Sequence, residues 1–138
     1  MSKGIVLVIE DEPQIQKMLG IILIHEGYEV VYASSGEKGL AALVNKKPQA
    51  VLLDMGLPDM EGSDVLLRIR EISDVAVIMV SVLSQVDIKI KCLKSGADDY
   101  ITKPFSAVEL TARLNAVLRR KTSNRFVDGV LIRDVHVK

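Results

Sequence analysis

Short apolar runs alternate with segments of helical period along most of this chain. Five runs have the length of strands, at residues 4–10, 28–33, 49–54, 75–81 and 98–103. The first of them, "GIVLVIE", is rich in β-branched residues and shows no polar alternation. Such a run is typical of a strand that is covered on both faces. The pattern therefore predicts a sheet buried between helices.

Each predicted strand is followed by a segment whose apolar residues recur at helical spacing. The first runs over residues 13–26, where Pro13 suits a first helical turn and Gly27 follows the end. Ser34 and Ser35 are N-cap candidates for a second helix that extends to about Lys46. A third helix follows the turn-rich stretch "GLPDMEG", a fourth ends near Ser95, and a fifth covers residues 106–120. The residues expected to face inward are Ile15, Met18, Leu19, Ile22 and Leu23 in the first helix, Leu40, Leu43 and Val44 in the second, Val65, Leu66 and Ile69 in the third, and Leu110, Leu114 and Val117 in the fifth.

Five strands that alternate with five helices predict an α/β domain with a parallel sheet and helices on both faces. Right-handed crossovers leave few possible topologies. We expect this domain to occupy residues 1–121. Residues 122–138 follow as a basic linker and a β-like stretch, "FVDGVLIRDVHVK", that has no helix left to complete a unit. This segment is either a tail or the opening of a second domain.

The composition is that of a globular protein without a strong net charge. The 138 residues are 49% hydrophobic and 26% charged, as in a globular domain. Lys plus Arg and Asp plus Glu both number 18, so bulk charge gives no argument for binding nucleic acid or membrane. The single cysteine, Cys92, excludes an internal disulfide and is expected to be a small packing residue. The first apolar run is too short for a signal peptide or a membrane span, so we expect a cytoplasmic protein.

Polar side chains stand where four of the predicted strands end. Glu10 and Asp11 follow the first strand, Asp54 the third, Ser81 the fourth and Lys103 the fifth. Any one of these residues could be a helix cap or a solvated side chain. Parallel α/β sheets, however, bring the carboxyl ends of their strands to one edge. Their occurrence at four strand ends therefore predicts a site.

The residue types at this edge suit the chemistry of phosphoryl groups. Asp11, Asp54 and Glu10 offer the hard oxygen ligands that Mg²⁺ prefers. Without a cation they would repel one another and raise at least one carboxyl pKa. Lys103 could neutralise an oxyanion, and Ser81 offers a hydroxyl to a phosphoryl oxygen. An Asp carboxylate can also act as a nucleophile and form an aspartyl phosphate.

Four stretches together resemble the receiver domain of bacterial two-component response regulators, over residues 3 to about 121. They are "VIEDEP" (8–13), "VLLDMGLPDMEG" (51–62), "VIMVS" (77–81) and "GADDYITKPF" (96–105). The resemblance implies a flavodoxin-like (CheY-like) doubly wound fold with five parallel strands in the order 2-1-3-4-5. It also implies a phosphoacceptor that is phosphorylated by a sensor histidine kinase. Catalysis would be limited to Mg²⁺-dependent self-phosphorylation and autodephosphorylation.

The resemblance also implies a role for each site residue. Asp54 would be the phosphoacceptor and Lys103 would contact the phosphoryl group. Asp11 would bind Mg²⁺ directly, Glu10 would act mainly through water, and the backbone carbonyl of Gly56 would complete the protein ligands.

Two further residues would form the switch. Ser81 would be the hydroxyl that turns toward the phosphoryl group, and Tyr100 the aromatic residue that turns inward in response. Val82 stands where receivers commonly have alanine, which puts the rates of phosphoryl transfer and loss in doubt.

"GADDYITKPF" followed by "ELTARLNAVLRR" is most similar to the OmpR/PhoB subfamily, whose output domain is a winged helix that binds DNA. Receivers of that subfamily pair, once phosphorylated, through the fourth helix, fifth strand and fifth helix. The residue pairs expected across such a homodimer are Lys89 with Glu109, Asp99 with Arg113, and Asp98 with Arg119 or Arg120, around an apolar centre of Ile90 and Leu93. The C-terminal stretch resembles the first strands of the output domain, so DNA would be bound only through a domain absent from this chain.

Three alternatives remain at this point. A phosphatase of the haloacid dehalogenase type would need an Asp-x-Asp pair after the first strand, whereas Asp11 is followed by Glu12 and Pro13. A flavin-binding module would need a hydroxyl-rich phosphate loop, and "EDEP" would repel the phosphate. A standalone receiver that acts through protein contacts, without DNA, is the third.

Overall fold

The computed structural model describes residues 2–123, 125–127 and 130–132, with side chains described as far as Thr122. Five parallel strands form one sheet in the order β2-β1-β3-β4-β5, which confirms the predicted fold. The strands are β1 (Ile5–Ile9), β2 (Glu29–Ala33), β3 (Ala50–Asp54), β4 (Ala76–Ser81) and β5 (Asp99–Thr102). The helices are α1 (Pro13–His25), α2 (Gly36–Lys46), α3 (Gly62–Ile72), α4 (Val86–Lys94) and α5 (Ala107–Ser123).

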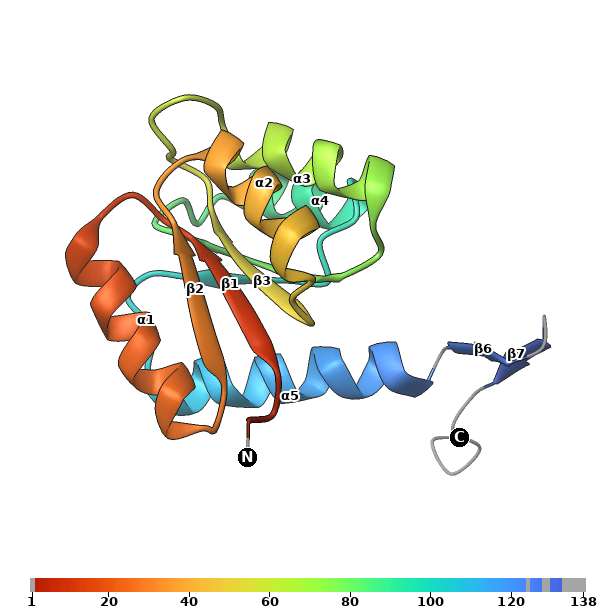
Figure 1. Ribbon diagram of the computed structural model, residues 1–138. Coiled ribbons are helices and arrows are strands. Elements are labelled where there is room, and N and C mark those ends of the chain that lie inside the picture. The colour runs from red at the N-terminus through yellow and green to blue at the C-terminus, as the bar shows by residue number, and fades with distance from the viewer. Residues whose placement is uncertain (1, 124, 128–129, 133–138) are drawn as a thin grey trace.

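The helices lie in two layers with the sheet between them. Figure 1 shows α1 and α5 on one face of the sheet and α2, α3 and α4 on the other. Side chains of β1 alternate between the two layers: Val6 and Val8 belong to the core under α1 and α5, while Leu7 and Ile9 belong to the core under the other three helices. Because both faces are covered, the central strands read as continuous apolar runs.

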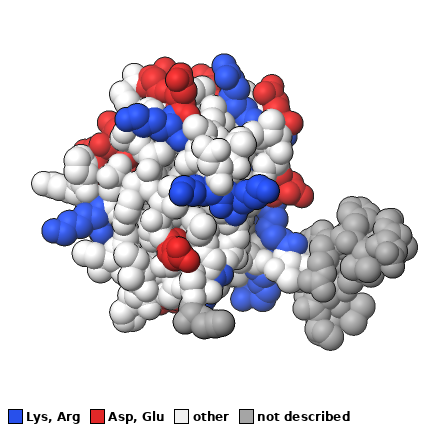
Figure 2. Space-filling model, in the orientation of Figure 1, with Lys and Arg blue, Asp and Glu red and all other residues white. Residues whose placement is uncertain are grey.

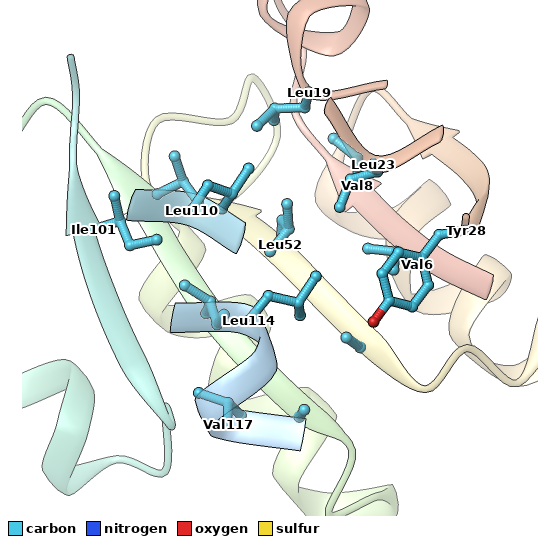
Figure 3. Packing of buried hydrophobic residues seen from close by; sticks show 14 residues of the cluster. Val6, Val8, Leu19, Leu23, Tyr28, Leu52, Ile101, Leu110, Leu114 and Val117 are labelled. Atoms are coloured by element: carbon cyan, nitrogen blue, oxygen red, sulfur yellow. The ribbon is translucent and has the colours of Figure 1, made fainter. Parts of the chain in front are cut away.

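The core on the α1 and α5 side is built from residues far apart in the sequence. Leu110, Leu114 and Val117 project from one face of α5 and have almost no exposed surface. Figure 3 shows these side chains packed over the sheet, near Ile101 of β5 and Leu52 of β3. Full burial of a side chain of this size contributes about 1.5–3 kcal/mol. This packing holds α5 against the strands whose ends form the site.

The inward face of α2 differs from the prediction. Leu43 is buried, but Val44 is 59% exposed, so the expectation that Val44 packs inward is wrong. The buried positions of α2 are Gly36, Gly39 and Leu43. A Cβ atom on Gly39 would lie 2.5 Å from Cδ1 of the fully buried Ile9. Glycine gives no hydrophobic signal, so the sequence pattern could not show that α2 approaches the sheet through its glycines.

The C-terminal part of the chain is partly described. Helix α5 continues to Ser123, beyond the predicted end at residue 120. After it, β6 (Arg125–Val127) pairs antiparallel with β7 (Val130–Ile132). Residues 124, 128–129 and 133–138 lie outside the described residues. The β-like character of this segment is therefore present, while its assignment to an output domain stays a prediction.

The surface that can be seen in the structure carries charges of both signs. Within the described part of the chain, no helix is both long enough and apolar enough to span a bilayer. Figure 2 shows Lys and Arg side chains interspersed with Asp and Glu among neutral residues on one face of the molecule. The mixed surface agrees with the zero net charge of the sequence.

A prediction concerns Gly62, where α3 begins against the end of β3. A Cβ atom there would lie 2.2 Å from the backbone oxygen of Asp54 and 2.7 Å from Cα of Met55. We expect Gly62→Ala to lower the free energy of unfolding by about 1–3 kcal/mol, measured by urea denaturation, because backbone must move. Gly56→Ala in the same loop is the control, since its Cβ would meet only Oδ2 of Asp54, at 3.9 Å. Equal stability of the two variants would contradict the packing argument.

Candidate functional site

Side chains from four strand ends meet at one edge of the sheet. Glu10 and Asp11 follow β1, Asp54 ends β3, Ser81 ends β4 and Lys103 follows β5. Glu10, Asp54 and Ser81, at 1%, 8% and 2% exposed, are the buried polar or charged residues of the described part of the chain. Polar groups are rarely buried unless they bind something or one another. The structure thus brings together the five residues that the sequence places at strand ends.

Three carboxylates at this edge could hold a metal ion. Glu10, Asp11 and Asp54 each offer one oxygen atom, and these atoms lie within 4.8 Å of one another. Asp11 is half-buried and the other two are buried. The donor set consists of carboxylate oxygens, which suits a small hard cation such as Mg²⁺ better than a transition metal. The residues therefore fit the ion that the sequence predicts.

The loop of residues 55–61 runs beside this cluster and connects β3 to α3. The amide of Gly62 donates a hydrogen bond to the carbonyl of Met55 at 2.8 Å. Gly56 and Glu61 form an isolated antiparallel bridge, which folds the loop back on itself. A Cβ on Gly56 would lie 3.9 Å from Oδ2 of Asp54, so the backbone of Gly56 passes close to the carboxylates. Its carbonyl as a metal ligand stays a prediction.

Lys103 reaches the cluster from the end of β5. Its Nζ lies 2.9 Å from Oε1 of Glu10 and 3.4 Å from Oδ1 of Asp54. Burial lowers the pKa of Lys103, but the two carboxylates outweigh that effect and the pKa is raised overall. The ammonium therefore stays protonated and compensates part of the negative charge.

Glu10 is the acid that the site perturbs most clearly. Its pKa is raised above the ordinary value of 4.5, chiefly by burial. The charge of Asp54 raises the pKa further, while hydrogen bonds from Lys103 and from the amide of Glu12, at 3.1 Å, lower it. The sequence predicted such a rise from mutual repulsion, whereas the larger cause is loss of water. Gln16, which sequence reasoning missed, donates to the Glu10 carbonyl at 2.6 Å.

The backbone of Leu83 connects Ser81 with Tyr100. The Leu83 amide donates to Oγ of Ser81 at 3.1 Å, and the Tyr100 hydroxyl donates to the Leu83 carbonyl at 2.8 Å. Tyr100 is 6% exposed, so its ring lies inward in this structure. Burial raises the pKa of its hydroxyl. Sequence reasoning missed Leu83 because a backbone group carries no signal in the residue type.

A cleft of about 610 Å³ opens beside Asp54. Its lining includes Leu57 of the 55–61 loop, Leu83 of the connection after β4, and Ile88 of α4. Val82 also lines it and is 68% exposed, so its side chain stands at the entrance. Cys92 is buried at 1% exposed, as expected for a packing residue, and burial raises the pKa of its thiol.

The residues predicted for a dimer interface lie on α4, on β5 or directly before it, and on α5. Ile90 and Leu93 of α4 are 45% and 44% exposed. Arg113 forms ion pairs within its own chain, at 3.1 Å to Asp99 and 3.2 Å to Glu109. Nζ of Lys89 lies 5.9 Å from the centroid of the Tyr100 ring. Because exposed pairs of this kind contribute only ~0–1 kcal/mol each, their value would lie in specificity.

Asp98 is engaged within the chain by partners that sequence reasoning missed. Its Oδ2 accepts hydrogen bonds from Arg70 at 3.1 Å and from the amide of Val77 at 2.9 Å. Lys121 lies 3.3 Å from Oδ1. Arg120 donates to the backbone carbonyl of Asp98 at 3.0 Å, so the predicted neighbours meet inside one chain. These contacts join the end of α5 to the connection before β5.

Comparison with known proteins gives one consistent family. The family model described as "Response regulator receiver domain" matches residues 6–115. The transcriptional regulatory protein KdpE of Mycobacterium tuberculosis is 47% identical over 119 residues, which cover 86% of this chain and 53% of that protein. The chain spans about half the length of the curated relatives it matches, 53% for KdpE and 50% for a probable transcriptional regulator of Porphyridium aerugineum.

A solved structure leads to the same family. A CheY-like response regulator receiver domain protein from Methanospirillum hungatei has a TM-score of 0.82 at 31% identity, covering 88% of this chain and 98% of that one.

A prediction follows from the raised pKa of Glu10. When the pKa of a carboxyl is higher in the folded than in the unfolded protein, the folded state holds the proton more tightly. This difference stabilises the fold fully at a pH below the unfolded pKa, and the stabilisation is lost as the pH rises through the folded pKa. At neutral pH without metal, ionised Glu10 therefore costs stability, and we expect Glu10→Gln to raise the free energy of unfolding by on the order of 1 kcal/mol. The gain should vanish below the ordinary pKa of 4.5, as followed by urea denaturation across pH.

Glu12→Gln is the matched control, because Glu12 is exposed beside the same cluster and should change stability by less than about 0.5 kcal/mol. A Glu10→Gln protein that is less stable than the wild type at neutral pH would show that the bond to Lys103 outweighs the cost of burial.

Proposed function

The chain belongs to the family of response regulator receiver domains, and on that premise we propose that it accepts a phosphoryl group on Asp54 from a sensor histidine kinase. The observation that carries the proposal is the carboxylate of Asp54, which is 8% exposed and lies 3.4 Å from Nζ of Lys103. It also belongs to the acidic cluster with Glu10 and Asp11. A buried nucleophile beside a cation and a metal-binding cluster suits phosphoryl transfer.

The chain's own residues would hold Mg²⁺ in an unequal way. Asp11 and Asp54 would bind it directly, Glu10 mainly through water, and Gly56 through its backbone carbonyl. The bound ion would supply compensation for the negative charge of the phosphoryl group. Burial of Glu10 and Asp54 supports a metal-binding role for the cluster, because neither carboxylate can be fully hydrated there.

The transfer itself needs few protein groups. An oxygen of Asp54 attacks the phosphorus atom, and the P–O bond forms as the P–N bond to the kinase histidine breaks. The electron pair of that bond stays with the histidine nitrogen. Lys103, whose ammonium already lies near Asp54, would stabilise the charge on the phosphoryl oxygens. Water later cleaves the aspartyl phosphate to carboxylate and inorganic phosphate.

Phosphorylation of Asp54 would change the contacts of Ser81 first. Its Oγ, now bonded to the Leu83 amide, would turn toward a phosphoryl oxygen. Leu83 also accepts the hydrogen bond of the Tyr100 hydroxyl, so movement of Leu83 would change how Tyr100 is held. Phosphorylation would thus stabilise one position of the ring and of the surface around it.

The output proposed for this receiver is control of transcription. Relatives that bear the name of transcriptional regulators, and the resemblance to the OmpR/PhoB type, support it. Two phosphorylated copies would pair through α4, β5 and α5, with Lys89 facing Glu109 and Asp99 facing Arg113. DNA would be bound only by an output domain beyond this chain, which the β6 and β7 pair would open. We place the protein in the cytoplasm, where kinase and DNA meet.

The phosphoacceptor is tested by labelling the protein with a histidine kinase or a small phosphodonor in the presence of Mg²⁺. The wild type should take up one acid-stable, base-labile phosphoryl group, and Asp54→Asn should take up none, because an amide oxygen is not nucleophilic enough. Asp64→Asn is the control, since Asp64 is an exposed acid in the first turn of α3. Intact-mass spectrometry gives the readout. Label that survives in Asp54→Asn would defeat the assignment.

Pairing is tested by sedimentation of the protein with Mg²⁺ and beryllofluoride, which imitates the phosphoryl group. Ile90→Glu should weaken the dimer by at least about tenfold, because a charge enters the apolar centre of the interface. Ile72→Glu is the matched control, since Ile72 is 59% exposed on α3, away from the proposed interface. An equal effect of the two substitutions would place the interface elsewhere.

A further inference from the structure

The side chain of Asp59 connects the 55–61 loop, beside the acidic cluster, to the start of α2. Asp59 accepts a hydrogen bond from the amide of Gly36 through Oδ1 at 2.8 Å, and one from the amide of Glu37 through Oδ2 at 3.0 Å. Both amides lie in the first turn of α2, where backbone N–H groups have no partner within the helix. A carboxylate of the 55–61 loop therefore satisfies the start of a helix that is distant in the sequence.

Close packing sets the position of α2 against this loop. A Cβ on Gly36 would lie 2.7 Å from Sδ of Met60 and 2.8 Å from Cγ2 of Val65. Helix α2 can begin this near the loop because residue 36 is a glycine. Met60 in turn packs against the buried cluster under α2 and α3. The two hydrogen bonds of Asp59 thus join two segments that are already in contact.

Asp59 contributes a charge without enlarging the acidic cluster. Its pKa is lowered, chiefly by the hydrogen bonds from Glu37 and Gly36, so the side chain is ionised at neutral pH. The positive end of the α2 dipole compensates this charge. The residues that could hold a metal ion are Glu10, Asp11 and Asp54, and Asp59 is not one of them. Its side-chain hydrogen bonds go to Gly36 and Glu37 and to none of these three acids, so we expect any effect on them to pass through the loop.

We propose that Asp59 is a positioning residue that holds the metal-binding loop in place by anchoring it to α2. The base of the loop is fixed by the bond from Gly62 to Met55 and by the bridge between Gly56 and Glu61. Asp59 fixes the segment between them. Without its two bonds only the packing of Met60 would hold the loop against α2, and the Gly56 carbonyl would spend less time near the carboxylates. The inference rests on the proposed function, because it takes Gly56 as a ligand of Mg²⁺.

The experiment compares two substitutions that remove a cap from the same end of α2. Ser35 accepts a hydrogen bond from the amide of Lys38 at 3.2 Å, but it does not belong to the loop. Asp59→Ala removes both the cap and the anchor, whereas Ser35→Ala removes only a cap. The full chain, labelled with ¹⁵N, is titrated with Mg²⁺ while the amide signals of Gly56, Gly36 and Glu37 are followed by NMR.

In the wild type, the signals of Gly36 and Glu37 should move with the same apparent dissociation constant as that of Gly56. Asp59→Ala should weaken Mg²⁺ binding by about threefold to tenfold, less than the ~10–100-fold loss typical for a direct partner of a metal ligand. The shifts of Gly36 and Glu37 should disappear in that variant. Ser35→Ala should keep the wild-type affinity within about twofold although it loses stability. Asp59→Asn should lie between wild type and Asp59→Ala, because the amide keeps one acceptor oxygen.

Two results would overturn the inference while leaving the proposed function intact. The first is an Asp59→Ala variant that binds Mg²⁺ as tightly as the wild type. The second is a Ser35→Ala variant that loses as much Mg²⁺ affinity as Asp59→Ala, because the loss would then come from a less stable α2 and not from the anchor. A wild-type protein that does not bind Mg²⁺ at all would instead overturn the proposed function, and this inference with it.

Discussion

The ammonium of Lys103 lies between two carboxylates that the sheet has removed from water, 2.9 Å from Glu10 and 3.4 Å from Asp54. Burying acids side by side is costly unless a positive charge compensates them. One lysine cannot balance three acids once Asp11 is included, so the edge of the sheet keeps a surplus of negative charge. Such a surplus suits a divalent cation, and Asp54 is the buried carboxylate that we propose as the phosphoacceptor. Parallel pairing of the strands holds these groups together, because each of them stands at or just after a strand end.

Two sets of contacts lead from this centre into the rest of the domain. One runs from Ser81 through the backbone of Leu83 to Tyr100, whose ring lies beside Lys89 of α4. The other runs along the 55–61 loop to the start of α2. A change at Asp54 can be passed on only where an element has two arrangements. We propose Tyr100 as such an element, because its hydroxyl donates to a loop carbonyl, that of Leu83, and its ring lies near Lys89 of α4.

Close approach of the helix backbones to the strands keeps the site compact. Gly62 lets α3 begin against the end of β3, and Gly39 lets α2 lie directly on Ile9. A side chain at either position would push a helix away from the strand whose end carries the chemistry. The domain thus depends on missing side chains as much as on the apolar ones that fill its core.

The sequence by itself determined the strands, the helices, the order of the sheet through the family resemblance, and the residues at the strand ends. It could do so because periodicity and residue type are local properties, and because the carboxyl ends of parallel strands always share an edge. Only the tertiary structure decided that Val44 points outward, that Leu83 joins Ser81 to Tyr100, and that burial raises the pKa of Glu10 more than repulsion does. These features depend on glycine contacts, backbone hydrogen bonds and loss of water. The type of a single residue cannot predict any of these three effects, because each arises only when segments distant in the chain come together.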